Sequence, residues 1–228
     1  MSVIAVDGPA GSGKSSVCRA VATRLGYRYL DTGAMYRALT WAMLHEGVDV
    51  DDAAAVAQAA SGVQIESGTD PSAPTIHVGA IDVSGPIRGD DVTAAVSAVS
   101  AVPRVREQLV ALQRAEVDRA RSEGRGIVVE GRDITTVVLP DADLKVFITA
   151  DPRVRASRRA LQDAGLGKSA VDVAETETAL RERDAKDSSR ETSPLAQAPD
   201  AIVLDTTEMT LDEVIDRFVG LVDGLPQE

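Results

Sequence analysis

The sequence is poor in cysteine, histidine and aromatic residues, and this scarcity excludes several kinds of site. Its one cysteine, Cys18, rules out a disulfide within the chain and a cysteine-rich metal site. His45 and His77 are the only histidines and lie far apart in the sequence, so we assign them no role. Since aromatic residues make up 3% of the chain, the core is expected to consist mainly of alanine, valine, leucine and isoleucine. Such a core suits an α/β protein with a buried parallel sheet.

Basic residues are also scarce, because 24 lysines and arginines face 36 acidic side chains and the net charge is −12. A surface this acidic disfavours sequence-independent binding to nucleic acid and to anionic membranes. No apolar run approaches the length that crosses a membrane. The sequence does not start with a charged segment followed by an apolar stretch, so we expect no secretory signal. We therefore expect a cytoplasmic protein that binds neither nucleic acid nor membrane.

The most informative motif lies near the N-terminus, between an apolar strand expected over residues 3–6 and a helix that ends at Gly26. There Gly8-x-x-x-x-Gly13-Lys14-Ser15 has the P-loop pattern. Glycines let the backbone N–H groups point at phosphate oxygens, and the helix adds its positive end. Lys14 can reach the β- and γ-phosphates, and the Ser15 hydroxyl can ligate Mg²⁺. The predicted nucleoside triphosphate site comprises Gly8, Pro9, Ala10, Gly11, Ser12, Gly13, Lys14, Ser15 and Ser16.

Four more buried strands alternate with helical patterns along the chain, and they are expected over residues 27–30, 127–129, 144–149 and 201–204. Strands that alternate with helices pair in parallel, so we predict an α/β fold whose five-stranded sheet is covered on both faces. Residues 63–83 instead alternate apolar and polar side chains between glycine-containing turns. This pattern predicts a small antiparallel meander inserted into the α/β chain.

Six stretches in this order resemble the bacterial cytidylate kinases, a family of nucleoside monophosphate kinases. They are GPAGSGKSS at 8–16, LDTGAMYRA at 30–38, DVSGPIR at 82–88, PRVR at 103–106, GRD at 131–133 and RERDAKDSSR at 181–190. The resemblance spans nearly the whole chain. It implies a three-layer P-loop NTPase fold with strand order 2-3-1-4-5. It also implies that ATP with Mg²⁺ phosphorylates CMP and dCMP.

The same resemblance implies one kinase unit over residues 1–228 that is divided into three parts. The core would comprise residues 1–31, 103–152 and 190–228. Residues 32–102, which contain the meander, would bind the nucleoside monophosphate, and residues 153–189 would form a helical lid. We expect this unit to be a monomer.

Carried over residue by residue, the resemblance assigns the acceptor site to three groups of side chains. Positions near the CMP phosphate are matched by Thr32, Arg37 and Arg132. Positions that read cytosine are matched by Ser97, Arg106 and Asp133. Positions around the ribose, base and phosphate are matched by Arg183, Asp187 and Arg190.

The chemistry of cytosine agrees with this assignment. Cytosine carries an amino donor at N4, where uracil presents an acceptor, and a carboxylate such as Asp133 distinguishes the two. Arg106 supplies donors for N3 and O2. The acceptor phosphate is already anionic, so transfer needs alignment and charge stabilisation rather than a strong base. Catalysis is assigned to Lys14 and Arg132, and the resemblance adds the lid arginines Arg158 and Arg159.

Three alternatives are open on the sequence alone. Another P-loop kinase would act on UMP, AMP, dTMP or shikimate, and only the acceptor residues argue against it. A GTPase usually reads guanine with Asn-Lys-x-Asp, but the chain has no asparagine. Nucleic-acid binding through the arginine clusters is disfavoured by the net charge.

No apolar strand ends in a clear metal-binding aspartate, because Asp7 comes too early and Glu130 and Asp133 are the nearest carboxylates.

Overall fold

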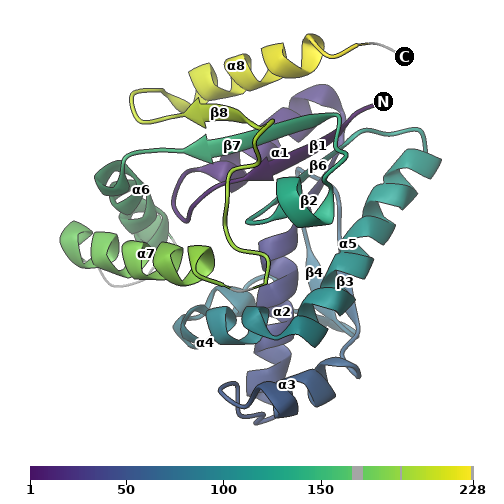
Figure 1. Ribbon diagram of the computed structural model, residues 1–228, viewed down its shortest axis with the longest axis vertical. Helices are drawn as coiled ribbons and strands as arrows, with labels where there is room; N and C mark the ends of the chain where they lie inside the picture. The colour runs from purple at the N-terminus through teal and green to yellow at the C-terminus, as the bar shows by residue number, and fades with distance from the viewer. Residues whose placement is uncertain (166–171, 191, 227–228) are drawn as a thin grey trace.

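The computed structural model describes residues 1–165, 172–190 and 192–226, and its centre is a parallel five-stranded sheet (Figure 1). The strands run in the order β2-β6-β1-β7-β8 across the sheet. Numbered among themselves along the chain, they have the order 2-3-1-4-5, which confirms the expected topology. Their bounds are β1 (Val3–Asp7), β2 (Arg28–Asp31), β6 (Ile127–Gly131), β7 (Leu144–Thr149) and β8 (Ile202–Asp205).

Helices cover both faces of the sheet, so the fold has three layers (Figure 1). Ile4 and Val6 of β1 belong to the apolar core shared with α1 and α8, whereas Val3 and Ala5 belong to the core shared with α2 and α5. This alternation is the two-residue period of a strand that is buried on both sides. The helices are α1 (Lys14–Leu25), α2 (Thr32–His45), α3 (Ala53–Ala60), α4 (Asp90–Ala101), α5 (Pro103–Ser122), α6 (Pro152–Gly165), α7 (Val173–Ser188) and α8 (Leu211–Asp223).

Local sequence signals fix the ends of several helices. The carboxylate of Asp31 accepts a hydrogen bond from the Ala34 N–H at 3.0 Å and caps α2. Thr210 and Glu213 form the reciprocal capping box that begins α8. Gly26 ends α1 in a left-handed conformation, with φ of 67°. These three boundaries were predictable because each depends on residues only a few positions apart.

The predicted meander is confirmed as a three-stranded antiparallel sheet of β3 (Ile65–Ser67), β4 (Ile76–Val78) and β5 (Ile81–Asp82). Its β3–β4 loop is tied to the main sheet, because the Tyr29 N–H donates to the Thr69 carbonyl at 3.0 Å. Arg19 of α1 also donates to the Pro71 carbonyl at 3.1 Å. The insertion therefore lies against the helix that follows the P-loop.

The carboxyl ends of three strands bring the predicted motifs to one edge of the sheet. In the strand register, Asp7 lies opposite Gly131 and Asp31 lies opposite Glu130. The P-loop, the first turn of α2 and Arg132 therefore begin side by side. Ligands of open α/β sheets bind at this edge.

One short element after β6 was not predicted. Residues 134–138 form a single π-helical turn, and the buried Asp7 carboxylate accepts from the N–H groups of Ile134 and Thr135 at 2.9 and 2.8 Å. Asp7 is thus occupied in holding this turn. Nothing in the sequence connects Asp7 to a segment more than 120 residues later.

The two helices of the expected lid, α6 and α7, pack side by side next to the P-loop (Figure 1). Residues 166–171 of that lid lie outside the described residues. Among the helices that the structure describes, none has the length and apolar character to cross a bilayer.

Candidate active site

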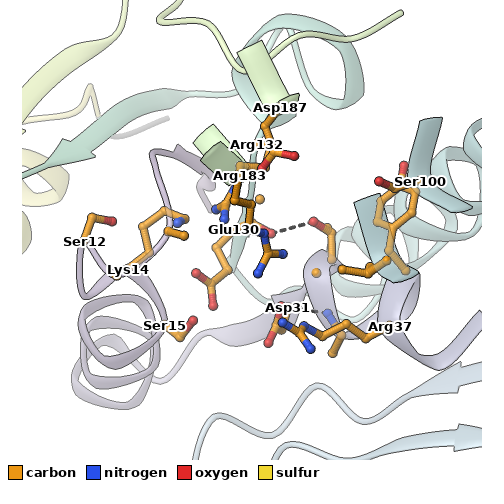
Figure 2. Close-up of a pocket in the computed structure, with 18 of the residues that line it drawn as sticks. Ser12, Lys14, Ser15, Asp31, Arg37, Ser100, Glu130, Arg132, Arg183 and Asp187 are labelled. Atoms are coloured by element: carbon orange, nitrogen blue, oxygen red, sulfur yellow. Dashed lines mark hydrogen bonds and ion pairs between the residues drawn. The ribbon is translucent and has the colours of Figure 1, made fainter. Parts of the chain in front are cut away.

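A cleft at the carboxyl edge of the sheet brings most of the predicted site residues together (Figure 2). They come from the P-loop, α2, α4, α5, the segment after β6, α6, α7 and the residues just after α7. The predicted residues that line it are Ala10, Gly11, Ser12, Gly13, Lys14, Ser15, Ser16, Thr32, Arg37, Ser97, Arg106, Arg132, Asp133, Arg159, Arg183, Asp187 and Arg190. Gly8, Pro9 and Arg158 are the predicted residues that do not line it.

The P-loop needs glycine for two different reasons. A side chain at Gly8 would place its Cβ 2.0 Å from the Ile148 carbonyl oxygen of β7, which leaves no room for one. Gly13 has φ of 84°, the left-handed conformation that turns the chain into α1. The amino end of α1 consequently faces the cleft, where it favours an anion.

Lys14 is buried beneath this loop (Figure 2). Its ammonium donates to the Gly8 carbonyl at 2.9 Å and to the Pro9 carbonyl at 3.3 Å. Burial, together with the charge of Arg132, lowers the pKa of Lys14. The nearby Ser12 hydroxyl is buried and has no hydrogen-bond partner in the described parts of the chain. A phosphate in the loop would satisfy this hydroxyl and stabilise the lysine cation.

Two arginines of the cleft, Arg37 and Arg183, are held without a carboxylate partner among the described residues. Arg37 donates to the Ile87 carbonyl and the Thr93 hydroxyl, both at 3.0 Å. Burial and the charge of Arg159 lower the pKa of Arg37 to about 10. Burial and the charges of Arg132 and Arg37 lower the pKa of Arg183 to about 9. Like charges gathered in a desolvated cleft are the electrostatic signature of a site for an anion.

Arg132 connects the P-loop to α7 (Figure 2). Its guanidinium donates to the Gly8 carbonyl at 2.9 Å and to Asp187 at 3.1 Å. Asp187 also pairs with Arg190, which donates to the Ser100 hydroxyl at 3.0 Å. This chain of contacts places a cation between the two ends of the cleft.

At the far end from the P-loop, Arg106 and Asp133 form a buried ion pair. Arg106 also donates to the Ser100 carbonyl at 3.2 Å, and its guanidinium carbon lies 5.3 Å from the centre of the Tyr36 ring. Burial raises the pKa of Tyr36 to about 12, so its phenol stays neutral. Tyr36 and Ser100 line the cleft but were not assigned to the predicted site. Tyr36 directly precedes Arg37, and Ser100 follows Ser97 by three residues on α4, so closeness to a predicted site residue was the available signal.

Arg158 lies apart from Arg159, its neighbour on α6. Its guanidinium donates to the hydroxyl and the carbonyl of Thr206, at 2.8 and 2.7 Å, just after β8. One of its nitrogens is 4.0 Å from the position that a Cβ on Gly13 would occupy. The side chain thus borders the outside of the P-loop, whereas Arg159 lines the cleft.

Two further carboxylates, Glu130 and Asp31, line the cleft near Ser15 and were missing from the predicted site (Figure 2). Glu130 accepts a hydrogen bond from the Tyr29 hydroxyl. Burial and the charge of Asp31 raise the pKa of Glu130, against the opposing effects of Lys14, Tyr29 and Ser15. Hydroxyl and carboxylate oxygens are the donors that Mg²⁺ prefers. Glu130 directly precedes the Gly131-Arg132 motif, and that position was the signal that could have identified it.

A family model described as "Cytidylate kinase" matches residues 4–223. A cytidylate kinase of Streptomyces griseus subsp. griseus is 56% identical over 222 residues, which cover 97% of this chain and 93% of the relative. That of Streptomyces avermitilis is 55% identical, with 97% and 92% covered. That of Mycolicibacterium paratuberculosis is 52% identical, with 96% and 94% covered.

Solved structures with similar architecture are much more distant in sequence. An uncharacterised protein of Eubacterium ventriosum is 13% identical with a TM-score of 0.52, and the match covers 98% of this chain and 99% of the other. A sugar kinase of Janibacter sp. is 14% identical with a TM-score of 0.50, over 98% and 95%. These two likenesses concern the fold alone. The match to the family model and the identity to relatives over almost their whole length identify this chain as a member of the cytidylate kinase family.

Proposed function

We propose that this protein transfers the γ-phosphoryl group of ATP to CMP and dCMP, giving ADP and CDP or dCDP. One observation carries the proposal beyond family membership. The P-loop and the Arg106–Asp133 pair line the same cleft, together with Arg37 and Arg183, for which no ion pair is found among the described residues. A donor phosphate, an acceptor phosphate and a base would each meet the groups that suit its charge.

On the donor side, the P-loop amides and Lys14 would hold the triphosphate. Lys14 now rests on two carbonyl oxygens and would exchange them for phosphate oxygens, which stabilise its charge better. Arg132 and Arg159 would stabilise the charge on the transferring group, and we keep Arg158 as a candidate for the same role after lid movement. Alignment of two anions in a shielded cleft is the main catalytic requirement of this reaction.

On the acceptor side, Thr32, Arg37 and Arg132 would hold the CMP phosphate. Arg183, Asp187 and Arg190 would surround the nucleotide. The Arg106–Asp133 pair, with Ser97 beside it, would read the cytosine ring. A buried polar pair left unmatched by the wrong base discriminates strongly, so UMP should be a poor acceptor.

Mg²⁺ would enter with ATP near Ser15, where the hydroxyl and the carboxylates of Glu130 and Asp31 offer oxygen ligands directly or through water. Bound there, the ion would shield the negative charge of the phosphates. No group of three clustered His, Cys, Asp or Glu residues occurs in the described ranges. These residues would therefore suit an Mg²⁺ ion that is coordinated mainly by the phosphates and by water.

We further propose the division into a core, a monophosphate-binding region over residues 32–102 and a lid over residues 153–189. A monomer would suffice, because one chain contributes both ends of the cleft. A cytoplasmic location would suit an enzyme whose substrates are ATP and nucleoside monophosphates.

A panel of acceptors tests the proposal directly. The purified chain, ATP and Mg²⁺ are incubated with CMP, dCMP, UMP, AMP, dTMP or shikimate, and ADP release is measured. We expect turnover with CMP and dCMP and much slower turnover with the others. Faster turnover with another acceptor would transfer the proposal to that kinase class, and GTP binding without phosphoryl transfer would exclude a kinase.

A further inference from the structure

Side chains of the two lid helices form hydrogen bonds with both backbone groups of Ala10 in the P-loop. The guanidinium of Arg155 on α6 donates to the Ala10 carbonyl at 2.9 Å. The carboxylate of Asp184 on α7 accepts from the Ala10 N–H at 3.2 Å. Arg155 and Asp184 are also ion-paired with each other. The three residues form a closed triangle that joins two helices to the phosphate-binding loop.

Further contacts surround this triangle. Arg155 is buried and donates a further hydrogen bond to the Ala150 carbonyl at 3.2 Å, at the end of β7. Ala10, Ala156 and Leu180 form a small apolar cluster of their own. A Cβ on Gly11 would lie 2.9 Å from the Arg155 carbonyl oxygen, so loop and helix already touch there.

Neither Arg155 nor Asp184 lines the cleft, yet each lies next to residues that do. Arg159 is one helical turn beyond Arg155 on α6. On α7, Arg183 immediately precedes Asp184. Fixing the triangle therefore fixes where these cleft arginines stand relative to the P-loop.

The charges of the pair also matter for the donor phosphates. The Ala10 N–H is occupied by Asp184 and is not available to a phosphate oxygen. Asp184 brings a negative charge to a loop that binds anions, and Arg155 neutralises it. Without Arg155, this carboxylate would repel the triphosphate and lose its partner in a largely shielded place.

We propose that Arg155 and Asp184 are positioning residues that couple the lid helices to the P-loop. Because Arg155 neutralises the charge of Asp184, the pair does so without repelling the phosphates of ATP. This inference rests on the proposed function, because it concerns the same donor site. It differs from a simple stabilising role in one respect. The two residues should be energetically coupled in ATP binding, with Arg155 needed chiefly because Asp184 is present.

A double-mutant cycle tests this coupling. The variants are Arg155→Gln, Asp184→Asn and both together, with the exposed Arg153→Gln on α6 as matched control. The dissociation constant for ATP without acceptor, the kinetic constants for both substrates and Tm are measured for each. Assays run well below the lowest Tm, so that loss of fold does not enter.

We expect Arg155→Gln to weaken ATP binding by about 10-fold or more, because the loop gains an uncompensated negative charge. Asp184→Asn should have a smaller effect, since its amide oxygen can still accept from Ala10. The double variant should bind ATP several-fold better than Arg155→Gln. Arg153→Gln should match the unmodified protein.

Two results would overturn the proposal: unchanged ATP affinity in Arg155→Gln, or no recovery in the double variant. A lower Tm with normal ATP affinity would assign the pair to stability alone. Failure of the unmodified protein to phosphorylate CMP would count against the proposed function instead, because ATP affinity is measured without acceptor.

Discussion

Arg106 and Asp133 form an ion pair in the wall of the cleft, although one lies in the first turn of α5 and the other follows β6. Only 5% and 6% of the two side chains is exposed. A neutral pair this well shielded offers fixed donors beside a fixed acceptor. That arrangement suits a base whose edge carries both a hydrogen-bond donor and hydrogen-bond acceptors, as the edge of cytosine does.

Asp133→Ala should erode the preference for CMP over UMP by about 10-fold or more in the ratio of kcat/KM, because it removes the acceptor proposed for N4. The substitution also leaves Arg106 buried without its partner, so Tm should fall. Steady-state kinetics with both acceptors measures the ratio. Asp118→Ala, on the exposed side of α5, is the control and should change neither quantity. An unchanged ratio would remove Asp133 from base recognition.

Lys14→Met should lower kcat/KM for ATP by about 10³-fold or more, since a cation aimed at the transferring phosphate is lost. The fold should be retained without loss of Tm, because the lysine is held charged in a desolvated place that lowers its pKa. Lys145→Met removes the ion pair that Lys145 of β7 makes with the exposed Asp200, outside the cleft lining, and serves as the control. Normal turnover by Lys14→Met would refute the assignment of the donor site.

ATP affinity should fall on the alkaline side of neutrality, at lower pH than the ordinary lysine pKa of 10.5 would give. The lowered pKa means that free Lys14 loses its proton early, whereas bound phosphates hold the proton on. Binding should therefore take up protons, which calorimetry in buffers of different ionisation enthalpy detects.

The sign for unfolding is opposite to that for binding. In the same pH window the unfolded chain holds the lysine proton that the folded chain releases, so the contribution of Lys14 to the free energy of unfolding rises with pH. Weaker binding is thus not a result of unfolding. Lys14→Arg keeps its charge and should flatten the profile. A profile as steep as that of the unmodified protein would assign the titration to another group.

Glu130→Gln should raise the Mg²⁺ concentration for half-maximal activity by about 10-fold, because it removes a charged oxygen near Ser15. The amide can still accept from the Tyr29 hydroxyl, so the core contact is preserved. Activity is titrated with Mg²⁺ at fixed ATP. Glu107→Gln, which lies on the exposed side of α5, is the control. An unaltered Mg²⁺ requirement would exclude Glu130 from the metal environment.

The sequence predicted features that depend on neighbouring residues. The P-loop, the caps at Asp31 and Thr210 and the five strands follow from short patterns, so the architecture could be predicted. The strand order and the acceptor residues came instead from the family resemblance. The chemistry of the side chains indicated that Arg106 and Asp133 suit cytosine. It did not predict that the two residues are ion-paired in the structure.

Contacts between distant segments were not predictable in this way. Asp7 looked like a residue at a strand end, but the structure uses it to hold the turn after Asp133. Arg158 resembled the neighbouring Arg159, yet it turns to Thr206. One helical position decides which side of the P-loop each arginine faces. That choice depends on the packing of α6, and no spacing in the sequence records it.

The arginines that share the cleft without enough carboxylates have a consequence for the end of each catalytic cycle. Arg37 is carried by α2 and Arg183 by α7, and the charge of Arg37 helps to lower the pKa of Arg183. Phosphates bound as proposed would attract both helices, and their departure would remove that attraction while the repulsion between the arginines stays. Product release would therefore remove the attraction that holds α2 and α7 together. Charge alone then favours an open entrance for the next pair of nucleotides.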